Sequence, residues 1–543
     1  MGKSDGAVLI TGATDGLGLE LARAYSKQGR RLILLGRRAM PQGDPLFTKE
    51  NYLRLDLTQS DCAKKVTDFL KARNIDRLSL CIMNAGTGYY GPASEQSLES
   101  IRDIVTVNLL APMRLTRALL PFVAPGESAV SESGNGNRAG KIAFISSVMS
   151  SLPCPLYAVY GATKAGLDGF ARNLRVEQKG RARIVLVRPG AIRTDMHRKL
   201  GMPLGEIKHD KFPPADQVAP KIIRYLESGG ESTVIGAGNK ILRFAGTNLR
   251  GLFRIILRKK PDAQSPDAPK AESNPYAGNN PVPSCLITGA ADGLGLELAR
   301  KLAKDGFYVV GVDVNPEKAE AAREKVIAEG GRVDFMLADL SKPAGMKKVV
   351  QQCASRKRSL GEGFDIVIHN AGISSTGDFA AGDDERHDRV TAVNLTAPMT
   401  ITSGLLKEGL VRPRASLVFI SSLSYFASYP GAAVYGASKD GIAAYARSLE
   451  LEPEGRHCLT VFPGPLRTAM AREHSPDNSR ENTRMHPEQA AELIVKAVRK
   501  RKRILVPGGG NKLFAFLGRY FPGLMEGMMK KLFFDKLVGE PRS

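Results

Sequence analysis

Short apolar runs alternate with stretches of helical spacing in the first part of the chain. The runs cover residues 7–10, 31–35, 78–83, 141–145 and 183–187, and each has the length of one buried strand. Strands that alternate with helices in this rhythm are typical of a parallel, doubly wound sheet with helices on both faces. The pattern therefore predicts an α/β fold of the Rossmann type.

The second part of the chain repeats the motifs of the first. Residues 9–23 read LITGATDGLGLELAR and residues 286–300 read LITGAADGLGLELAR, so only Thr14 and Ala291 differ. Further motifs recur in the same order at 84–86 and 370–372, 107–112 and 393–398, 144–147 and 419–422, 160–164 and 435–439, and 238–240 and 510–512. A repeat this long indicates a duplicated domain rather than a solenoid, whose repeats span about 20–50 residues.

The repeat predicts two tandem domains, at 1–258 and 284–543, joined by a linker at 259–283 that is rich in Pro, Ala, Asn and charge. The spacing between equivalent residues changes from 277 to 286 and then to 275, at Gly12 and Gly289, Asn84 and Asn370, and Tyr160 and Tyr435. The second copy therefore has about nine extra residues before its Asn-Ala-Gly motif. The first copy has about eleven extra residues between Asn108 and Ser147, where 126–137 is predicted to be a surface loop.

The repeated glycine motif follows a predicted strand and opens a predicted helix, the arrangement that binds a dinucleotide. Its first glycine permits a tight turn, the later glycines let the backbone approach a pyrophosphate, and the helix N-terminus offers free N–H groups. The predicted phosphate-binding residues are Gly12, Asp15, Gly16, Leu17 and Gly18 in the first copy and Gly289, Asp292, Gly293, Leu294 and Gly295 in the second.

The end of the second strand predicts a different cofactor for each copy. In the second copy Asp313 lies 18 residues after Gly295, where a carboxylate accepts hydrogen bonds from the ribose hydroxyls and repels a 2′-phosphate. The first copy has Gly36 at this position, followed by Arg37 and Arg38, whose guanidinium groups suit a 2′-phosphate. We therefore expect NADP in the first domain and NAD in the second. The alternative is that the two arginines are only solvated surface residues.

Both halves resemble the short-chain dehydrogenase/reductase family over almost their whole length. The resemblance rests on ThrGlyXXXGlyXGly, AsnAlaGly, a serine 13 residues before TyrXXXLys, and ProGly followed by threonine. It implies two complete catalytic tetrads, formed by Asn108, Ser147, Tyr160 and Lys164 and by Asn394, Ser422, Tyr435 and Lys439.

The spacing of the tetrad residues agrees with acid–base chemistry. Residues four apart on a helix share one face, so the lysine ammonium lies beside the phenol. A neighbouring cation favours the phenolate, which lets tyrosine give or take the proton of an alcohol. The family resemblance implies that the serine hydrogen-bonds the substrate oxygen and that the asparagine holds a water relay for protons.

The resemblance also implies further cofactor contacts. Asp56 and Asp339 are expected near the adenine, and Thr194 and Thr468 near the nicotinamide amide. The remaining expected contacts come from the Asn-Ala-Gly and Pro-Gly motifs. They are Asn84, Gly86, Pro189, Asn370, Gly372 and Pro463. One departure concerns Asp15 and Asp292, because some NADP-binding members carry a basic residue there. This departure weakens the prediction of NADP in the first domain without reversing it.

Each copy ends in a predicted amphipathic helix. The apolar positions are Leu249, Leu252, Phe253, Ile256 and Leu257, with Arg250, Arg254 and Arg258 beside them, and Met525, Met528, Met529, Leu532 and Phe533, with Lys530 and Lys531 beside them. Such helices either pack over their own domain as a wall of the substrate pocket or lie in an anionic membrane surface. The packed arrangement is the favoured interpretation.

The residues between serine and tyrosine, and those after ProGly, are expected to select the substrate. The first copy has Met149, Leu152, Cys154 and Leu156 in this segment, and the second has Tyr425, Phe426 and Tyr429. Both pockets are predicted to be apolar but different in shape. We expect Cys154 to be a packing residue rather than a nucleophile.

Composition narrows the remaining possibilities. The net charge is +23, but the basic clusters lack interleaved aromatic residues, so binding of nucleic acid is not expected. Six well-separated cysteines without a histidine cluster predict neither a disulfide framework nor a metal site. No apolar run approaches the about 18–20 residues of a membrane span, and no signal-peptide pattern precedes the first strand. These features predict a cytoplasmic protein, peripheral to a membrane at most.

The sequence thus predicts an oxidoreductase with two active sites that act on a secondary alcohol or ketone of a hydrophobic molecule. Family members commonly dimerise through the helix that carries tyrosine and lysine, so the two halves are expected to form an internal pseudo-dimer. Copies of the whole chain could then associate further into a homo-oligomer. The unlike cofactors suggest oxidation at one site and re-reduction at the other, which inverts a stereocentre. Two alternatives remain open: independent reactions on different compounds, or one catalytic domain with a noncatalytic nucleotide-binding or dimerisation partner.

Overall fold

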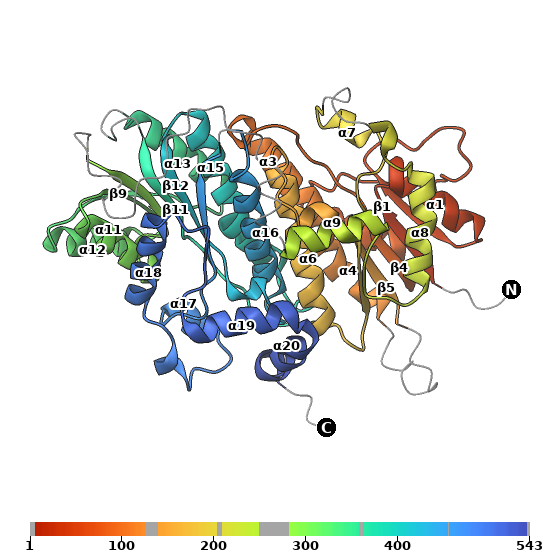
Figure 1. Cartoon of the computed structure of the whole chain (residues 1–543). Coiled ribbons are helices and arrows are strands. Elements are labelled where there is room, and N and C mark those ends of the chain that lie inside the picture. Colours follow the sequence, from red (N-terminus) through yellow and green to blue (C-terminus); the bar gives the residue numbers. More distant parts are fainter. Residues whose placement is uncertain are drawn as a thin grey trace.

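The computed structural model describes residues 6–124, 139–202, 209–248, 282–357, 360, 363–453 and 455–539. It contains two α/β domains, each built on a seven-stranded parallel sheet (Figure 1). The sheet orders are β3-β2-β1-β4-β5-β6-β7 and β10-β9-β8-β11-β12-β13-β14. In each sheet the first strand of the domain, β1 or β8, lies inside the sheet, and later strands are added first on one side of it and then on the other, as in doubly wound sheets. The predicted fold class is confirmed.

The strands of the first domain are β1 Ala7–Thr11, β2 Leu32–Gly36, β3 Tyr52–Arg54, β4 Leu78–Met83, β5 Lys141–Ile145, β6 Arg183–Arg188 and β7 Ser232–Val234. Those of the second are β8 Ser284–Thr288, β9 Tyr308–Asp313, β10 Arg332–Leu337, β11 Phe364–His369, β12 Val411–Ile420, β13 His457–Val461 and β14 Ile504–Leu505. The five predicted strands of the first domain are all present. The two edge strands β3 and β7 were not predicted, because three residues are too few to show a period.

The α-helices of the first domain are α1 Gly16–Lys27, α2 Cys62–Lys71, α3 Leu98–Val105, α4 Ala111–Val123, α6 Ala158–Glu177, α7 Met196–Lys199, α8 Ala215–Glu227 and α9 Ala237–Asn248. The second domain has α11 Gly293–Lys304, α12 Pro316–Ala328, α13 Pro343–Ser355, α14 Asp384–Thr391, α15 Ala397–Lys407, α16 Ala433–Leu449, α17 Ala469–Glu473, α18 Pro487–Arg499, α19 Gly509–Tyr520, α20 Pro522–Met529 and α21 Asp535–Val538.

Alternate residues of the central strand β1 pack into two separate apolar cores, one on each face of the sheet. Val8 and Ile10 pack with α1 and α8 on one face of the sheet. Leu9 packs on the other face, with α2, α4 and α6. In the second domain α11 and α18 cover one face, whereas α13, α15 and α16 cover the other. The inner faces of both domains belong to one continuous apolar core.

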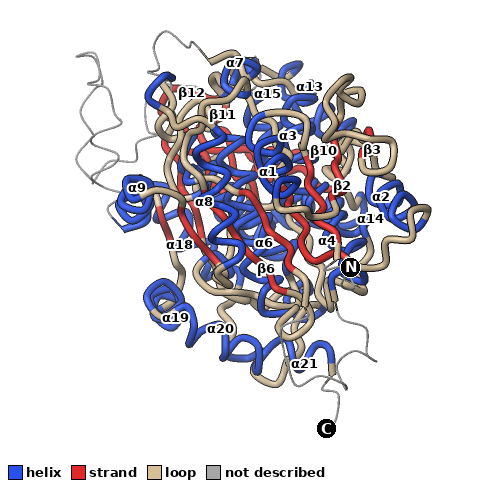
Figure 2. The backbone as a smooth tube through the Cα atoms, turned by 90° about the vertical axis from the view of Figure 1, so that its right-hand side faces the viewer, coloured by secondary structure: helices blue, strands red, loops and turns tan. Residues whose placement is uncertain are grey.

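The two domains meet through α6 and α16, which lie against each other between the two sheets (Figure 1). Figure 2 views the molecule from the side of the first domain, where α1 and α8 lie in front of the strands. Glycines let these helices approach closely. A Cβ atom on Gly166 would lie 3.1 Å from the carbonyl oxygen of Ala437, and one on Gly441 would lie 3.1 Å from that of Ala162. The ring centroids of Phe170 and Phe379 lie 5.0 Å apart across the same contact.

Ion pairs flank this helix contact. The guanidinium group of Arg114 binds the Asp388 carboxylate with two hydrogen bonds, one of them 3.2 Å long. Arg117 binds Asp384 in the same bidentate manner, at 2.8 and 2.5 Å. The Arg114 side chain is only 8% exposed, so removal of its partner would leave a buried, uncompensated charge. The pairs therefore fix which surfaces of the two domains face each other.

Helix α12 accounts for most of the extra residues in the second copy. It lies between β9 and β10, whereas the first domain connects β2 to β3 through turns without a helix at 37–51. The loop predicted at 126–137, the helix predicted around 249–258 and the linker up to residue 281 lie outside the described residues. The assigned domain boundaries therefore remain a prediction.

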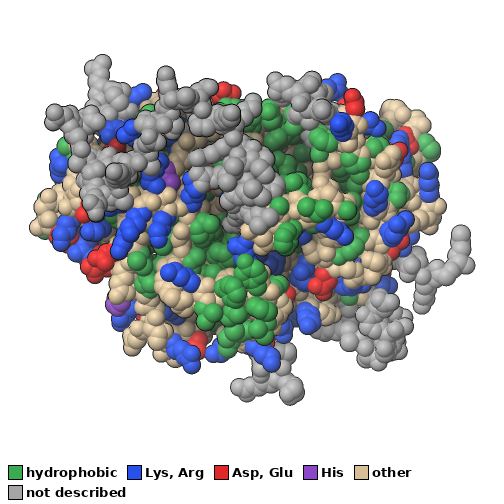
Figure 3. All heavy atoms as spheres, viewed as in Figure 1, with side chains coloured by type: hydrophobic (Ala, Val, Ile, Leu, Met, Phe, Trp, Pro, Cys, Tyr) green, Lys and Arg blue, Asp and Glu red, His purple; other side chains and the backbone are tan. Residues whose placement is uncertain are grey.

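The C-terminal extension of the second domain is helical and only partly amphipathic. Met525 is buried, whereas Met528 and Leu532 are exposed. Phe533 packs on Tyr429 with ring centroids 4.2 Å apart, so the extension covers its own domain at this point. Exposed apolar side chains also gather on α9 and α19, which lie on one face beside lysines and arginines (Figure 3). Among the described helices, none has the length and apolar character needed to cross a bilayer.

Candidate active site

Each predicted tetrad is assembled at the carboxyl ends of the central strands. Ser147 follows β5, Tyr160 and Lys164 lie one turn apart on α6, and Asn108 comes from the segment between α3 and α4. Parallel sheets of this topology bind ligands at this edge. In the second domain Ser422 likewise follows β12, Tyr435 and Lys439 lie on α16, and Asn394 comes from the segment between α14 and α15.

The two asparagines lie in π-helical turns, at Thr106–Leu110 and Ala392–Thr396. Such turns are rare and frequently occur at functional sites. Asn108 accepts a 2.8 Å hydrogen bond from the Thr87 N–H and donates to the Thr87 carbonyl at 2.8 Å. Its amide also donates to Thr163 Oγ1 at 3.0 Å, which ties it to the helix of Tyr160 and Lys164.

The second asparagine makes the same contacts. Asn394 accepts from the Ile373 N–H at 2.9 Å, and its amide donates to the Ile373 carbonyl at 2.9 Å and to Ser438 Oγ at 3.1 Å. Both asparagines therefore clamp the loop after the Asn-Ala-Gly motif to the catalytic helix. This structural duty accompanies the proton-relay role that the family resemblance implies.

Both lysines are buried beside their tyrosines. Lys164 Nζ lies 5.8 Å from the centroid of the Tyr160 ring, and Lys439 Nζ lies 5.6 Å from that of Tyr435. Each ammonium donates a 2.9 Å hydrogen bond to the last carbonyl of the preceding strand, in Ile145 or Ile420. Burial lowers the pKa of both lysines to about 8. The lysines therefore change charge close to neutral pH.

Burial has the opposite effect on the phenols. It raises the pKa of Tyr160 to about 12, although the hydrogen bond with Ser147 opposes the shift. Burial likewise raises the pKa of Tyr435, opposed by Ser422. The protein alone therefore favours the neutral phenol, which is the proton donor. Formation of phenolate requires additional positive charge next to the ring.

The glycine motif forms the predicted tight turn in both domains. Gly12 and Gly289 have φ angles of +67° and +63°, a left-handed conformation that favours glycine. A Cβ atom on Gly18 would lie 2.1 Å from the Gly12 carbonyl oxygen, and one on Gly295 would lie 1.8 Å from that of Gly289. Only glycine fits at these two helical positions, because any side chain would push the helix off the turn.

The side chains of Asn84 and Asn370 hydrogen-bond the backbone of the glycine turn. The Asn84 amide donates to the Thr11 carbonyl at 3.1 Å, and the Asn370 amide donates to the Thr288 and Gly289 carbonyls at 3.1 and 2.9 Å. The structure thus gives these asparagines a supporting role in the cofactor site. Gly86 and Gly372 lie next to the tetrads, since a Cβ atom on either would contact the catalytic lysine and asparagine.

The adenosine end of the site differs between the domains. In the second domain Asp313 accepts hydrogen bonds from the backbone N–H groups of Ala291, Val314 and Asn315 at 2.8–3.2 Å. In the first domain a Cβ atom on Gly36 would lie 2.7 Å from both Thr14 Cγ2 and Tyr52 Oη. The space for a carboxylate is therefore filled. The Thr14-to-Ala291 difference thus accompanies the exchange of Gly36 for Asp313.

Asp15 does not present a bare negative charge. Arg38 binds its carboxylate at 3.0 Å, and Lys199 binds the same oxygen. These two cations lower the pKa of Asp15 against the opposing effect of burial. Two cations on one carboxylate leave the pocket positive. The equivalent Asp292 pairs with Lys318 at 2.7 Å, and Lys318, with a smaller contribution from Arg472, lowers the pKa of its carboxyl.

The other predicted contacts occupy equivalent places in both domains. Asp56 and Asp339 each accept two hydrogen bonds from the residue two positions later, Thr58 or Ser341, at 2.6–2.9 Å. Thr194 and Thr468 lie over the helix N-termini, within 3.1 and 3.3 Å of where a Cβ atom on Gly16 or Gly293 would stand. The Pro189 and Pro463 carbonyls accept from the residue after the catalytic serine, at 3.0 and 3.1 Å.

Two groups of residues near the site were not predicted as functional. Asn239 and Asn511 contact Gly190 and Gly464, the glycines of ProGly, which explains why the Gly-Asn-Lys motif recurs. Asp168, one turn beyond Lys164, binds Arg188 at 2.6 Å and lies 3.7 Å from Arg243. The second domain has Ala443, Phe462 and Ala515 at the equivalent positions, so a charged cluster in one domain is apolar in the other.

The substrate-selecting segments also differ. In the first domain Tyr90, Tyr157 and Tyr160 form a chain of rings with centroids 5.1 and 6.2 Å apart, while Leu152 and Cys154 are buried together. In the second domain Tyr425, Phe426 and Phe462 pack together with centroids 5.0–5.1 Å apart, and Tyr429 lies 6.3 Å from Tyr435. Both walls are largely apolar, and the thiol of Cys154 lies in packing contact.

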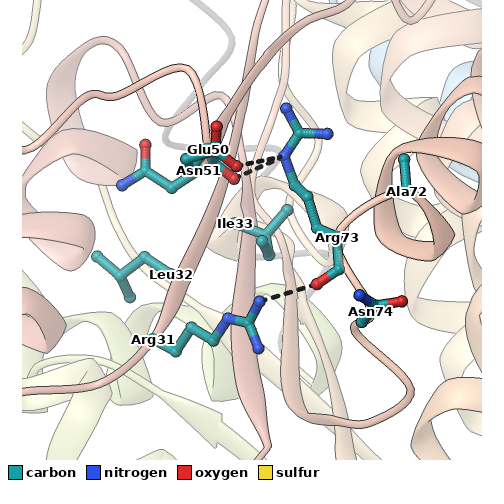
Figure 4. Close-up of a pocket in the computed structure, with 8 residues that line it drawn as sticks. All are labelled: Arg31, Leu32, Ile33, Glu50, Asn51, Ala72, Arg73 and Asn74. Carbon is teal, nitrogen blue, oxygen red and sulfur yellow. Dashed lines mark hydrogen bonds and ion pairs between the residues drawn. The ribbon is translucent and has the colours of Figure 1, made fainter.

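A separate cavity of about 320 Å³ lies beside the start of β2, at the opposite edge of the first sheet (Figure 4). Polar groups line it, and Arg31 and Arg73 donate to backbone carbonyls around it. This edge carries none of the tetrad residues. We therefore assign the chemistry to the carboxyl edge and not to this cavity.

Comparison with known proteins identifies the class of this site. The family model described as short chain dehydrogenase matches residues 6–203 and again 284–479. The chain belongs to this family, whose members are NAD(P)-dependent oxidoreductases, and it contains the family domain twice.

Individual relatives each match one half of the chain. The oxidoreductase UcpA of Escherichia coli K12 is 27% identical over 237 residues, which are 43% of this chain and 86% of that protein. The 1-deoxy-11-beta-hydroxypentalenate dehydrogenase of Streptomyces avermitilis is 32% identical over 222 residues, 40% of this chain and 80% of the relative.

One solved structure matches both halves together. This N-terminal ketoreductase from a macrolactin assembly line matches 93% of this chain and 87% of its own, with a TM-score of 0.58 at 13% identity, and so shares the two-domain fold.

The buried lysines predict a pH limit on turnover. Their pKa is lowered from 10.5 to about 8, so the ammonium beside each tyrosine is present below pH 8 and lost above it. We expect kcat/KM for ketone reduction, which reports the free enzyme, to be level below about pH 7 and to fall above pH 8. The measurement is a pH–rate profile for each cofactor. A fall that begins only above pH 10 would contradict the desolvated lysine.

Proposed function

We propose that this chain is an oxidoreductase with two active sites, each of which transfers hydride between a nicotinamide dinucleotide and a secondary alcohol or ketone of a hydrophobic molecule. The observation that carries this proposal is that both domains hold a complete tetrad with matching hydrogen bonds. A domain kept only for its shape would be free to lose the hydroxyl group of its tyrosine. The name of the Streptomyces relative, a hydroxypentalenate dehydrogenase, supports an alcohol as substrate.

The geometry supports a division of labour within each tetrad. The nicotinamide, when bound, supplies or accepts the hydride. Tyr160 and Tyr435 donate the proton to the ketone oxygen during reduction and take it back during oxidation. Ser147 and Ser422 hydrogen-bond both the phenol and the substrate oxygen, which orients them. Lys164 and Lys439 hold positive charge next to the phenol and so lower the cost of transient phenolate.

The glycine turns and the charges around them fit a dinucleotide. The N-termini of α1 and α11 begin at the glycine turn, which is where a pyrophosphate binds in a dinucleotide site. In the first domain, the space of a carboxylate at Gly36 is filled, and Arg37, Arg38 and Lys199 surround the pocket, which favours the extra phosphate of NADP. In the second domain, Asp313 favours NAD. We therefore assign NADP to the first domain and NAD to the second.

This assignment predicts that removal of one catalytic tyrosine hydroxyl at a time separates the two activities. Tyr160→Phe should lower NADP(H)-linked turnover of a bulky secondary alcohol or ketone by about 10²–10⁴-fold, the typical contribution of general acid–base catalysis. NAD(H)-linked turnover should persist. Tyr435→Phe should show the reverse pattern. The measurement is steady-state turnover with each cofactor across a panel of such alcohols and ketones.

Tyr445→Phe is the matched control, because Tyr445 lies on the same helix as Tyr435 and its buried hydroxyl has no hydrogen-bond partner among the described residues. It should leave both activities in place. If either catalytic variant abolishes both activities, or neither, the assignment of one cofactor to each domain is wrong.

We further propose that the two sites act in sequence on one substrate. The NAD-linked site oxidises an alcohol, and the NADPH-linked site reduces the resulting ketone from the other face, so the stereocentre is inverted with little net redox change. The unlike adenosine ends of the two sites motivate this order. Two independent reactions on different compounds remain the alternative.

Stereochemistry distinguishes the two possibilities. With one pure enantiomer of a converted alcohol, NAD⁺ and NADPH together should yield the opposite enantiomer. Tyr160→Phe should stop the reaction at the ketone. The products are resolved by chiral chromatography. Retention of configuration under every cofactor pairing would favour two independent reactions.

A further inference from the structure

The helix that carries the catalytic pair of one domain also contacts the substrate segment of the other. Asn173 and Glu177 lie on α6, about four and five turns beyond Tyr160, and both are buried. Asn173 Oδ1 accepts a 2.6 Å hydrogen bond from the Tyr429 N–H, and Glu177 Oε1 accepts a 2.7 Å bond from the Gly431 N–H. Tyr429 and Gly431 belong to the stretch between Ser422 and Tyr435.

Three more hydrogen bonds join α6 to the second domain. Glu177 Oε2 accepts from the Phe379 N–H at 3.3 Å, in the loop after the second Asn-Ala-Gly motif. Arg172, also on α6, donates to the carbonyls of Ser424 and Tyr425 at 2.9 and 3.3 Å. The first domain therefore holds the second domain's substrate segment at both ends.

The second domain returns the contacts from equivalent positions, two on α16 and one, Glu452, just beyond its end. Ser448 Oγ accepts a 3.1 Å hydrogen bond from the Cys154 N–H, between Ser147 and Tyr160. Glu452 Oε2 accepts from the Ala93 N–H at 2.9 Å, and Arg447 donates to the Ser150 carbonyl at 3.2 Å. The exchange is reciprocal, since each residue lies 275 positions from its counterpart on α6.

The substrate segment of the first domain adopts a backbone conformation that needs such support. Leu156 has a φ angle of +65°, in the left-handed region that leucine rarely adopts, whereas the equivalent Gly431, at +81°, adopts it without strain. A residue other than glycine persists in this region only when its surroundings hold it there. The Leu156 carbonyl accepts from the Gly91 N–H at 2.9 Å, and the Gly431 carbonyl accepts from the Gly377 N–H at 2.8 Å. These bonds join the segments to the loops that the glutamates hold.

We propose that Glu177 is a positioning residue for the active site of the second domain and Glu452 a positioning residue for that of the first. Each carboxylate fixes, across the domain contact, the backbone that places the other domain's serine and substrate wall around its tyrosine. The two sites are thus completed in trans within one chain. The catalytic consequence of this inference rests on the proposed function, whereas the positioning itself does not.

The direct test is hydrogen–deuterium exchange of the full chain without substrate. Glu177→Ala removes both acceptors, so exchange in peptides 423–434 and 376–382 should become about tenfold faster, as expected for lost buried hydrogen bonds. Peptide 148–159 should not change. Glu177→Gln keeps one oxygen and should give an intermediate rate. Glu452→Ala should act on peptide 90–96 and leave 423–434 unchanged.

Glu227→Gln, at the end of the outer helix α8, is the matched carboxylate control and should alter none of these peptides. If Glu177→Ala unfolds the chain, Asn173→Ala and Ser448→Ala provide the same crossed comparison for peptides 423–434 and 148–159. Unchanged exchange in the opposite domain, or equal acceleration in both domains, would overturn the proposal.

Turnover then connects positioning with catalysis. Glu177→Ala should lower NAD(H)-linked kcat about tenfold and leave NADP(H)-linked kcat in place, with the reverse for Glu452→Ala. If exchange follows the crossed pattern but the unsubstituted chain shows no nicotinamide-linked turnover, the proposed function fails while the positioning stands. If turnover is present and both glutamate variants retain it fully, the catalytic part of the inference is overturned.

Discussion

The close contact between α6 and α16 is the interaction on which the rest of this molecule depends. The same two helices carry Tyr160 with Lys164 and Tyr435 with Lys439, so the surface that joins the domains is the back of both catalytic helices. Gly166 and Gly441 permit the approach, and the apolar core continues through it. A contact this extensive makes the halves one folding unit rather than two independent enzymes on a tether.

Several differences between the two domains involve residues that contact one another. Thr14 and Gly36 in the first domain correspond to Ala291 and Asp313 in the second, and each pair fits together sterically. The buried charges of Asp168, Arg188 and Arg243 correspond to Ala443, Phe462 and Ala515. Such joint exchanges keep the charges of this buried cluster paired while they alter the chemistry of a site. They are consistent with two sites that share a mechanism and differ in ligands.

Much of this arrangement could be predicted from the sequence, because its signals are local or repeated. Apolar runs located the central strands, and the spacing of serine, tyrosine and lysine located both tetrads. The edge strands β3 and β7 were too short to show a period. The cluster around Asp168 and the bonds of Glu177 to Gly431 and Phe379 join residues 20 to 254 positions apart, which no local pattern reveals. Nor did the sequence show that burial, and not the lysine, dominates the pKa of Tyr160 in the free protein.

The central claim is that one chain holds two unlike dinucleotides, each next to its own lysine–tyrosine pair. Native mass spectrometry of the intact chain in an equimolar mixture of NAD⁺ and NADP⁺ tests it most directly. We expect a dominant species with one molecule of each cofactor, and loss of NAD⁺ alone when Asp313 is replaced by alanine. Two molecules of the same dinucleotide on one chain, or a single molecule at saturation, would contradict the account.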